Sequence, residues 1–205
     1  MSDDITFYYN PRSRAQMAYW MLEEVGAPYT IVNIDFESGE NRKPEFLAIN
    51  PMGKLPTIVH RGVVVTETAA ICAYLADMFP KAGLAPAPDD PKRGTWLRWL
   101  VFGASAFEPA LIDKLLKRPE VSKMTAGWGS YDDVLGALET AVEPGPWILG
   151  DTFSAADVYI GAELAWATSF GAPGIMDRPT LATYIERVKA RPGYQRSIGQ
   201  VRPSS

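Results

Sequence analysis

The chain has 205 residues, of which 47% are hydrophobic and 21% charged, and this globular composition excludes disordered and fibrous classes. The length allows one large domain or two small ones. Acidic residues outnumber basic ones by 24 to 20, and the net charge of −4 argues against nucleic acid as a partner. No apolar run reaches the roughly 18 residues that span a bilayer, and the opening Met-Ser-Asp-Asp does not resemble a signal peptide. We therefore expect a cytoplasmic protein without a membrane partner.

Cysteine and histidine each occur only once. Cys72 alone excludes an internal disulfide framework and a Cys-x-x-Cys redox pair, and His60 alone excludes a multi-histidine metal cluster. We therefore expect no metal site. His60 ends a strand pattern directly before Arg61-Gly62, so we expect it at a sheet edge or in a turn.

The first eighty residues alternate between strand and helix patterns. β-branched and aromatic runs predict strands at 5–9, 29–36, 57–60 and 63–66. Apolar residues at three- and four-residue intervals predict helices at 14–25 and 67–79, the second of which Pro80 ends. Residues 38–50 are polar, with a brief helical stretch. The pattern predicts an α/β domain over 1–80.

Residues 81–91 have the proline and glycine content of a linker. After it, helical patterns predominate, at 92–117, about 121–142, 155–170 and 180–190. Ser154 is expected to cap the third of these helices, with Asp157 three residues later in a variant of the capping box. The sequence therefore predicts a linker at 81–91 and an all-helical domain at 92–205.

Two segments of the first domain offer groups for a ligand. Pro56 begins a strand, and a cis Leu55–Pro56 bond would direct the backbone of Leu55 toward a ligand, although an X-Pro bond is more often trans. Glu67-Thr68 opens a helix directly after a strand, so unpaired N–H groups would attract an anion at Thr68 while Glu67 accepts from an ammonium group. Alternatively, Thr66 caps this helix and Glu67 only offsets its dipole.

Four motifs occur in a recognisable order. They are Tyr9-Asn10-Pro11-Arg12-Ser13-Arg14-Ala15, Asn50-Pro51-Met52-Gly53-Lys54-Leu55-Pro56, Thr66-Glu67-Thr68-Ala69-Ala70-Ile71, and Phe153-Ser154-Ala155-Ala156-Asp157. With a linker between the last two, the chain resembles the cytosolic glutathione S-transferases over nearly its whole length. The resemblance implies a thioredoxin-like N-terminal domain, an all-α C-terminal bundle, a homodimer and a cis bond before Pro56.

The same resemblance implies glutathione as co-substrate. The backbone of Leu55 would pair with its cysteinyl part, while Glu67 and Thr68 would hold the γ-glutamyl end. Lys54 would approach the glycyl carboxylate, for which Arg42 and Lys43 are further candidates.

The residue that activates the glutathione thiol stays open. This family uses a tyrosine, serine or cysteine near the end of the first strand, and here no cysteine is available. Ser13 is the hydroxyl of the loop and lies at the start of a helix, whose dipole favours a thiolate. Counting back from the helix arginine places Asn10 at the serine position of some family members, and the phenols of Tyr8 and Tyr9 are nearby. If the strand alternates, only one of the two tyrosines faces the site.

The leading hypothesis is a glutathione transferase that conjugates the thiolate to a small hydrophobic electrophile. The electrophile would lie between the domains, against the helix at 92–117. One alternative keeps the glutathione site for disulfide or peroxide reduction, or for isomerisation. Another is a non-catalytic binding or interaction protein of the same fold.

Overall fold

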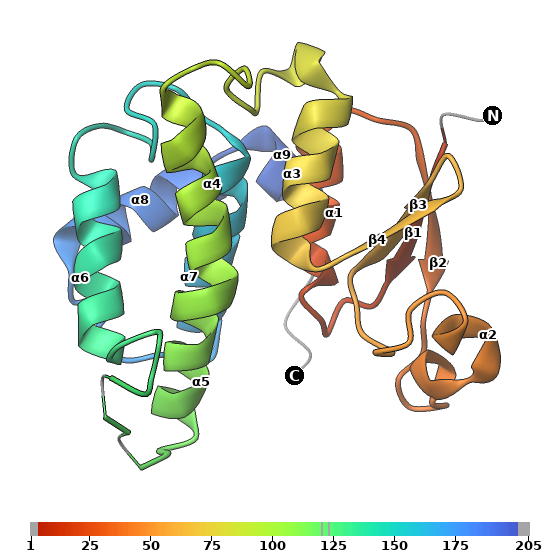
Figure 1. Cartoon of the computed structure of the whole chain (residues 1–205), viewed down its shortest axis with the longest axis horizontal. Helices are drawn as coiled ribbons and strands as arrows, with labels where there is room; N and C mark the ends of the chain where they lie inside the picture. Colours follow the sequence, from red (N-terminus) through yellow and green to blue (C-terminus); the bar gives the residue numbers. More distant parts are fainter. Residues whose placement is uncertain (1–3, 120, 123, 201–205) are drawn as a thin grey trace. The chain divides into compact units, whose positions relative to one another are not determined.

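A computed structural model of the chain describes residues 4–119, 121–122 and 124–200. These residues form two compact units (Figure 1). The first unit contains residues 4–82 and, from the other end of the chain, 192–200, while the second contains residues 83–191. The first is an α/β unit and the second is entirely helical, as the sequence predicts.

A four-stranded sheet forms the middle of the first unit, in the order β2-β1-β3-β4. Its strands are β1 (Ile5–Tyr9), β2 (Tyr29–Asn33), β3 (Thr57–His60) and β4 (Val63–Thr66). β1 runs parallel to β2 and antiparallel to β3, which in turn runs antiparallel to β4. The four predicted strands are thus confirmed, except that β2 ends at Asn33 instead of continuing to residue 36.

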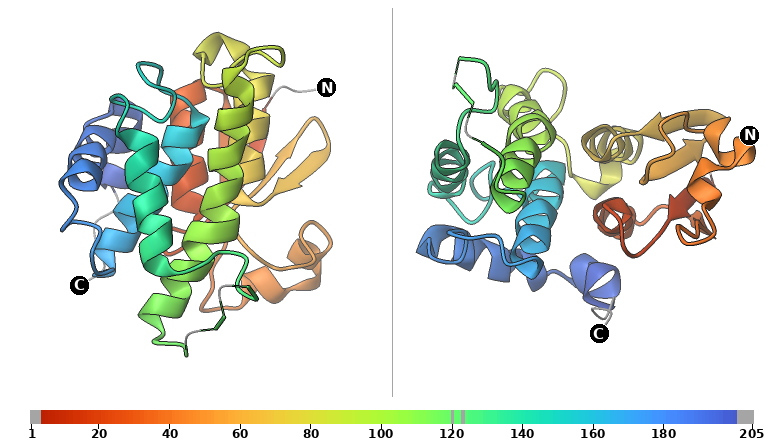
Figure 2. Two further views of the ribbon diagram at one scale, coloured as in Figure 1. Left: turned by 60° about the vertical axis from the view of Figure 1, so that its left-hand side comes forward. Right: turned by 90° about the horizontal axis from the view of Figure 1, so that it is seen from below.

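Helices cover both faces of the sheet. Helices α1 (Ala15–Val25) and α3 (Thr68–Met78) lie side by side on one face (Figure 2). The aromatic rings of Phe7 and Tyr9 in β1 pack there against Tyr19 of α1, at centroid distances of 6.2 and 5.5 Å. The short α2 (Pro44–Leu47) lies on the opposite face, where its Phe46 ring meets Tyr8 at 5.5 Å. Two covered faces explain why β1 is apolar at nearly every position.

His60 is not the edge or turn histidine that we expect from the sequence. It is 1% exposed and belongs to β3, an interior strand because β4 pairs beyond it. Its Nδ1 lies 3.0 Å from the hydroxyl of Tyr74 on α3, and its ring stacks on Phe79. The short turn at Arg61-Gly62 indicated exposure, but α3 covers the strand up to that turn.

The second unit contains α6 (Tyr131–Val142), α7 (Ala155–Ser169) and α8 (Pro179–Lys189), which follow α4 (Lys92–Phe102) and α5 (Glu108–Leu115). The single helix predicted at 92–117 is divided by a π-helical segment, Gly103–Phe107. A Cβ atom at Gly103 would lie 2.6 Å from the ring of Tyr159 on α7, so glycine lets the two helices approach closely. Nearly all of α7 is buried, and it contacts both α4 and α8.

The helix predicted at about 121–142 begins later than expected. Residues 120 and 123 lie outside the described residues, and the described residues from 124 to 129 form turns. Gly129 has a left-handed backbone with φ of 74°, which ends any helix before it. Ser130 then starts α6 by sharing a capping box with Asp133. The helix predicted from the apolar spacing of 121–129 is therefore wrong, because Gly129 and the cap at Ser130 place the start of the helix after these residues.

The last described segment returns to the first unit. Helix α9 (Pro192–Arg196) packs on α1, where the Tyr194 ring meets Trp20 edge to face at 5.2 Å. The guanidinium Nε of Arg196 lies 2.8 Å from a carboxylate oxygen of Glu23. The sequence-based division instead assigns this segment to the helical domain, because helical periodicity does not indicate which unit a helix packs on.

The predicted cap of α7 is present and deeply buried. The Asp157 carboxylate accepts hydrogen bonds from the Ser154 N–H (2.9 Å), the Ser154 hydroxyl (3.0 Å), the Ile148 N–H (2.8 Å) and the Tyr184 hydroxyl (3.0 Å). Burial raises the pKa of Asp157 to about 6, and these hydrogen bonds act in the opposite direction.

This raised pKa predicts an unusual pH dependence. An unfolded aspartate has a pKa near 3.8, so between about pH 4 and 6 the folded chain holds a proton on Asp157 that the unfolded chain lacks. The resulting stabilisation is complete below pH 3.8 and is lost as the pH rises through 6. Asp157→Asn removes the titration. We expect the unfolding free energy of the natural protein, relative to this variant, to increase by about 1 kcal/mol between pH 7 and pH 5. Urea unfolding of both proteins measures the difference, and a constant or decreasing difference contradicts the prediction.

Candidate functional site

One end of the sheet brings the predicted site segments together. Thr57, the first residue of β3, lies opposite Tyr8 of β1 and opposite Thr66 of β4. The residues before Thr57, those after Tyr8 and those after Thr66 therefore leave the sheet at the same end. These are the Leu55–Pro56 turn, the loop from Asn10 to Arg14 and the start of α3.

The peptide bond between Leu55 and Pro56 is cis, which confirms the expectation drawn from the resemblance. Buried Asn50 holds this turn, since its Nδ2 donates to the Lys54 carbonyl (2.9 Å) and to the Thr57 hydroxyl (3.0 Å). Within the part of the chain that the structure describes, the Leu55 N–H and C=O make no hydrogen bond. This backbone pair is therefore available to a ligand. The role of Asn50 was not predicted from the sequence, although this residue opens the motif that contains Pro56.

Glu67 has an unusual backbone conformation directly before α3. Its φ of 65° and ψ of 120° are unfavourable for a residue with a Cβ, at a cost of about 1–3 kcal/mol. The side chain is exposed, and among the described residues it makes no hydrogen bond or ion pair. Strained, uncommitted residues of this kind are typical of ligand sites.

The start of α3 offers N–H groups beside Glu67. The first helical hydrogen bond joins the Ile71 N–H to the Glu67 carbonyl (2.9 Å), so the N–H groups of Thr68, Ala69 and Ala70 come before the hydrogen-bonded ladder. Among the described residues no side chain caps this helix, so the alternative in which Thr66 is its cap is not observed. The positive end of the helix dipole lies at Thr68.

The loop after β1 is organised around Asn10. This residue is 8% exposed, and its Nδ2 donates to the Ile34 carbonyl (2.8 Å) while its Oδ1 accepts from the Arg12 N–H (2.8 Å). Its carbonyl oxygen accepts from the Ser13 N–H (3.2 Å) and from the Ser13 hydroxyl (2.7 Å). Ser13 is half-buried, and its Oγ also accepts from the Ala15 N–H (3.1 Å). Both candidate thiolate donors are thus linked to each other.

The two tyrosines of β1 face opposite sides of the sheet, as strand alternation requires. Tyr9 is buried between Phe7 and Tyr19, and this burial, followed by the proximity of Tyr19, raises its pKa to about 12. Tyr8 is half-buried against Phe46. The phenol of Tyr9 is therefore a neutral group well above physiological pH.

The basic residues of the first unit differ in how far they are already engaged. Arg42 donates to the Met52 carbonyl (3.2 Å), and Lys43 lies 3.7 Å from the Glu40 carboxylate. Lys54 is exposed, and its ammonium group makes no hydrogen bond or ion pair with any described residue. Of these three candidates, Lys54 is the least engaged cation for a carboxylate.

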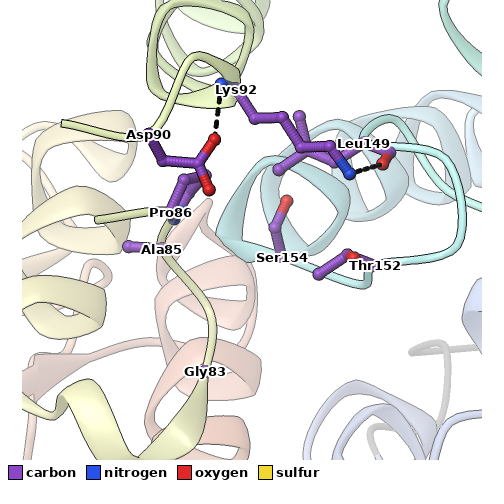
Figure 3. A pocket seen from close by; sticks show the side chains of 8 residues that line it. All are labelled: Gly83, Ala85, Pro86, Asp90, Lys92, Leu149, Thr152 and Ser154. Atoms are coloured by element: carbon purple, nitrogen blue, oxygen red, sulfur yellow. Dashed lines mark hydrogen bonds between the residues drawn. The ribbon is translucent and has the colours of Figure 1, made fainter. Parts of the chain in front are cut away.

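A small cavity of about 140 Å³ lies in the second unit (Figure 3). The Lys92 ammonium group donates there to the Leu149 carbonyl (3.3 Å), and the Asp90 carboxylate accepts from the Lys92 N–H (2.7 Å). None of the predicted site residues lines this cavity. Its charged groups are engaged in holding the linker and the start of α4, so we assign it a structural role.

The described residues form neither a cluster of metal-binding side chains nor a membrane-spanning helix. Over residues 4–119, 121–122 and 124–200, no group of three or more His, Cys, Asp or Glu side chains is placed to hold a metal ion. Within the same residues no helix is both long enough and apolar enough to cross a membrane.

Fold and motifs together define a thioredoxin-like unit followed by a helical unit, which confirms the fold class predicted from the sequence. A family model described as glutathione S-transferase, N-terminal domain, matches residues 4–77, and one described as glutathione S-transferase, C-terminal domain, matches residues 110–190. Because these matches cover well over half of the chain, it belongs to the glutathione S-transferase family.

Individual relatives are similar to the chain at low identity. A glutathione transferase structure from Methylococcus capsulatus is 29% identical, with a TM-score of 0.80 over 95% of this chain and 97% of that chain. A homologue from Sulfitobacter with bound glutathione is 27% identical, with a TM-score of 0.74 over the same shares. The disulfide-bond oxidoreductase YfcG of Escherichia coli K12 is 25% identical over 92% of this chain and 91% of that protein.

Proposed function

We propose that the protein is a glutathione S-transferase that conjugates the glutathione thiolate to a small hydrophobic electrophile. One observation carries this proposal. Among the described residues, the Leu55 N–H and C=O and the Glu67 side chain make no hydrogen bond, and they lie at the same end of the sheet as the unpaired N–H groups that begin α3. A protein that served only as a scaffold would have no need for such groups at one place. The active molecule is expected to be a homodimer.

Each part of glutathione has a proposed partner. The γ-glutamyl end carries an ammonium group for Glu67 and a carboxylate for the N–H and hydroxyl groups of Thr68. The cysteinyl part, which follows next in the peptide, pairs its own N–H and C=O with those of Leu55 before Pro56, as a strand would. Lys54 then attracts the glycyl carboxylate. In this arrangement the glutathione sulfur is expected near the loop that contains Ser13, because that loop leaves the sheet at the same end as the Leu55–Pro56 turn.

Ser13 is proposed to activate the thiol, and Asn10 is the alternative donor. A free thiol with a pKa near 8.5 is only a few per cent ionised at pH 7. A hydroxyl that donates to sulfur stabilises the charged form and so lowers the thiol pKa, and the N-terminus of α1 adds to the effect. The thiolate then attacks the electrophilic carbon, forms a thioether bond and expels the leaving group with its electron pair, while the thiol proton passes to solvent.

A second candidate function is disulfide reduction, which the similarity to a disulfide-bond oxidoreductase favours. Here the glutathione thiolate attacks one sulfur of a substrate disulfide and releases a thiolate. A second glutathione resolves the mixed disulfide, giving glutathione disulfide and a second thiol. Because the chain has only Cys72, which is buried within α3, the sulfur chemistry would belong entirely to glutathione.

Calorimetry with glutathione tests both functions at once. We expect binding with a dissociation constant in the micromolar to millimolar range, and absence of binding at millimolar glutathione would rule out both. An activated aryl chloride and a small symmetric disulfide, each supplied with glutathione, then separate the two reactions. Faster conjugation than disulfide reduction supports the transferase, and the reverse order favours the reductase.

A further inference from the structure

We propose that Asn10 is a positioning residue for the Ser13 hydroxyl. The backbone carbonyl of Asn10 accepts a hydrogen bond from this hydroxyl until glutathione binds, and the hydroxyl then donates to the glutathione thiolate instead. This inference rests on the proposed function and specifies how the thiol is activated. Asn10, the alternative thiolate donor, thereby receives a different role.

The direction of each hydrogen bond around Ser13 follows from its partners. A carbonyl oxygen only accepts and a backbone N–H only donates. The Ser13 hydroxyl must therefore donate to the Asn10 carbonyl at 2.7 Å, while its oxygen accepts from the Ala15 N–H at 3.1 Å. The Ala15 bond fixes the oxygen atom, so only the hydroxyl hydrogen has to rotate when a better acceptor arrives.

The side chain of Asn10 fixes the backbone carbonyl that accepts from the Ser13 hydroxyl. Its side chain bridges two backbone groups, the Ile34 carbonyl beyond β2 and the Arg12 N–H within the loop. Ile34 is tied back in turn, since its N–H donates to the Tyr9 carbonyl (2.8 Å). The residue is 8% exposed, and its bond to Ile34 is buried, whereas its bond from Arg12 is partly buried. The Asn10 carbonyl is thereby fixed within reach of Ser13.

The Ser13 hydroxyl changes its acceptor for the thiolate but not for the neutral thiol. A neutral thiol is a weak acceptor that cannot draw the hydroxyl away from a carbonyl. A thiolate is charged, and hydrogen bonds to charged groups are roughly twice as strong as neutral ones. The Asn10 carbonyl keeps the Ser13 N–H bond when the hydroxyl leaves, so no buried acceptor is left without a partner. Ser13 therefore stabilises the thiolate selectively and lowers the thiol pKa.

A double-mutant cycle tests this role of Asn10. The observable is the pH midpoint at which bound glutathione develops thiolate absorbance, with S-methylglutathione as the blank. We expect Ser13→Ala to raise the midpoint by about 1 to 2 pH units, and Asn10→Ala to raise it by a smaller amount. In the Ser13→Ala background, Asn10→Ala is expected to leave the midpoint unchanged, because Asn10 acts through the hydroxyl.

Other outcomes overturn the proposal. An equal shift by Asn10→Ala in both backgrounds makes Asn10 a direct donor, and no shift in the natural background removes its positioning role. Asn10→Ser serves if the alanine variant does not fold, because a serine hydroxyl can still accept from the Arg12 N–H but does not extend to Ile34. We expect it to show the same pattern. Asn33→Ala, at an exposed asparagine of β2, is the matched control without a shift.

Calorimetry separates this proposal from the proposed function. If the variants and the natural protein all fail to bind glutathione, the proposed function fails. If they bind with similar affinity but the midpoints do not follow the cycle, only the role of Asn10 fails.

Discussion

Replacing Asp157 by alanine is expected to lower the free energy of unfolding of the second unit by about 4 kcal/mol. The carboxylate satisfies the Ile148 N–H, the Ser154 N–H and two hydroxyl groups, in a place with no exposure to solvent. Leaving a buried donor without a partner costs about 1–3 kcal/mol each, and the two hydroxyls can partly rearrange. Urea unfolding near neutral pH, monitored by tryptophan fluorescence, measures the loss.

The chain contains a matched control for this prediction. Asp133 makes the same capping box with Ser130 at the start of α6, but Asp133 is exposed. Water replaces the lost acceptor there, so Asp133→Ala should cost only about 1 kcal/mol. Similar losses at the two positions would show that burial of the cap is not what matters.

The same comparison shows what the sequence could predict. Spacing alone identified the Ser154–Asp157 cap, because a capping box is a local pattern of two residues three apart. The contacts of Asp157 with Ile148 and Tyr184 are not local, since they depend on how the loop before α7 and helix α8 pack. The sequence therefore predicted the motif, whereas the contribution of Asp157 to the free energy of unfolding could be inferred only from the structure.

The candidate site shows the same division. Motifs in the sequence identified the Leu55–Pro56 turn and the Glu67-Thr68 helix start, and strand register brings them to one end of the sheet. Two features were missed because they depend on conformation and on contacts distant in sequence. Glu67 has a positive φ without being a glycine, so its residue type does not indicate this conformation. The contact from Asn10 to Ile34 spans 24 residues. Packing of α9 on α1 was missed for the same reason.

Glu67→Gly is expected to raise stability and lower glutathione affinity at the same time. Glycine adopts a φ of 65° without steric cost, so the substitution relieves strain of about 1–3 kcal/mol, partly offset by the greater entropy of the unfolded chain. We expect a net gain of about 1 kcal/mol in urea unfolding. Loss of the carboxylate should weaken glutathione about 30-fold in calorimetry, as for a charged hydrogen bond of roughly 2 kcal/mol.

Two comparisons separate the backbone effect from the charge effect. Glu67→Gln keeps the strained backbone, so it should lose affinity without gaining stability, and Glu45→Gln, at an exposed position on α2, should change neither. A glutathione analogue that lacks the α-amino group should bind the natural protein and Glu67→Gln equally, because the proposed partner of the carboxylate is missing. Equal weakening of both ligands would show that Glu67 acts on the fold of the site and not on the ammonium group. If Glu67→Gly raises stability while it lowers affinity, the strain at Glu67 is retained for binding, because stability alone would favour glycine at this position.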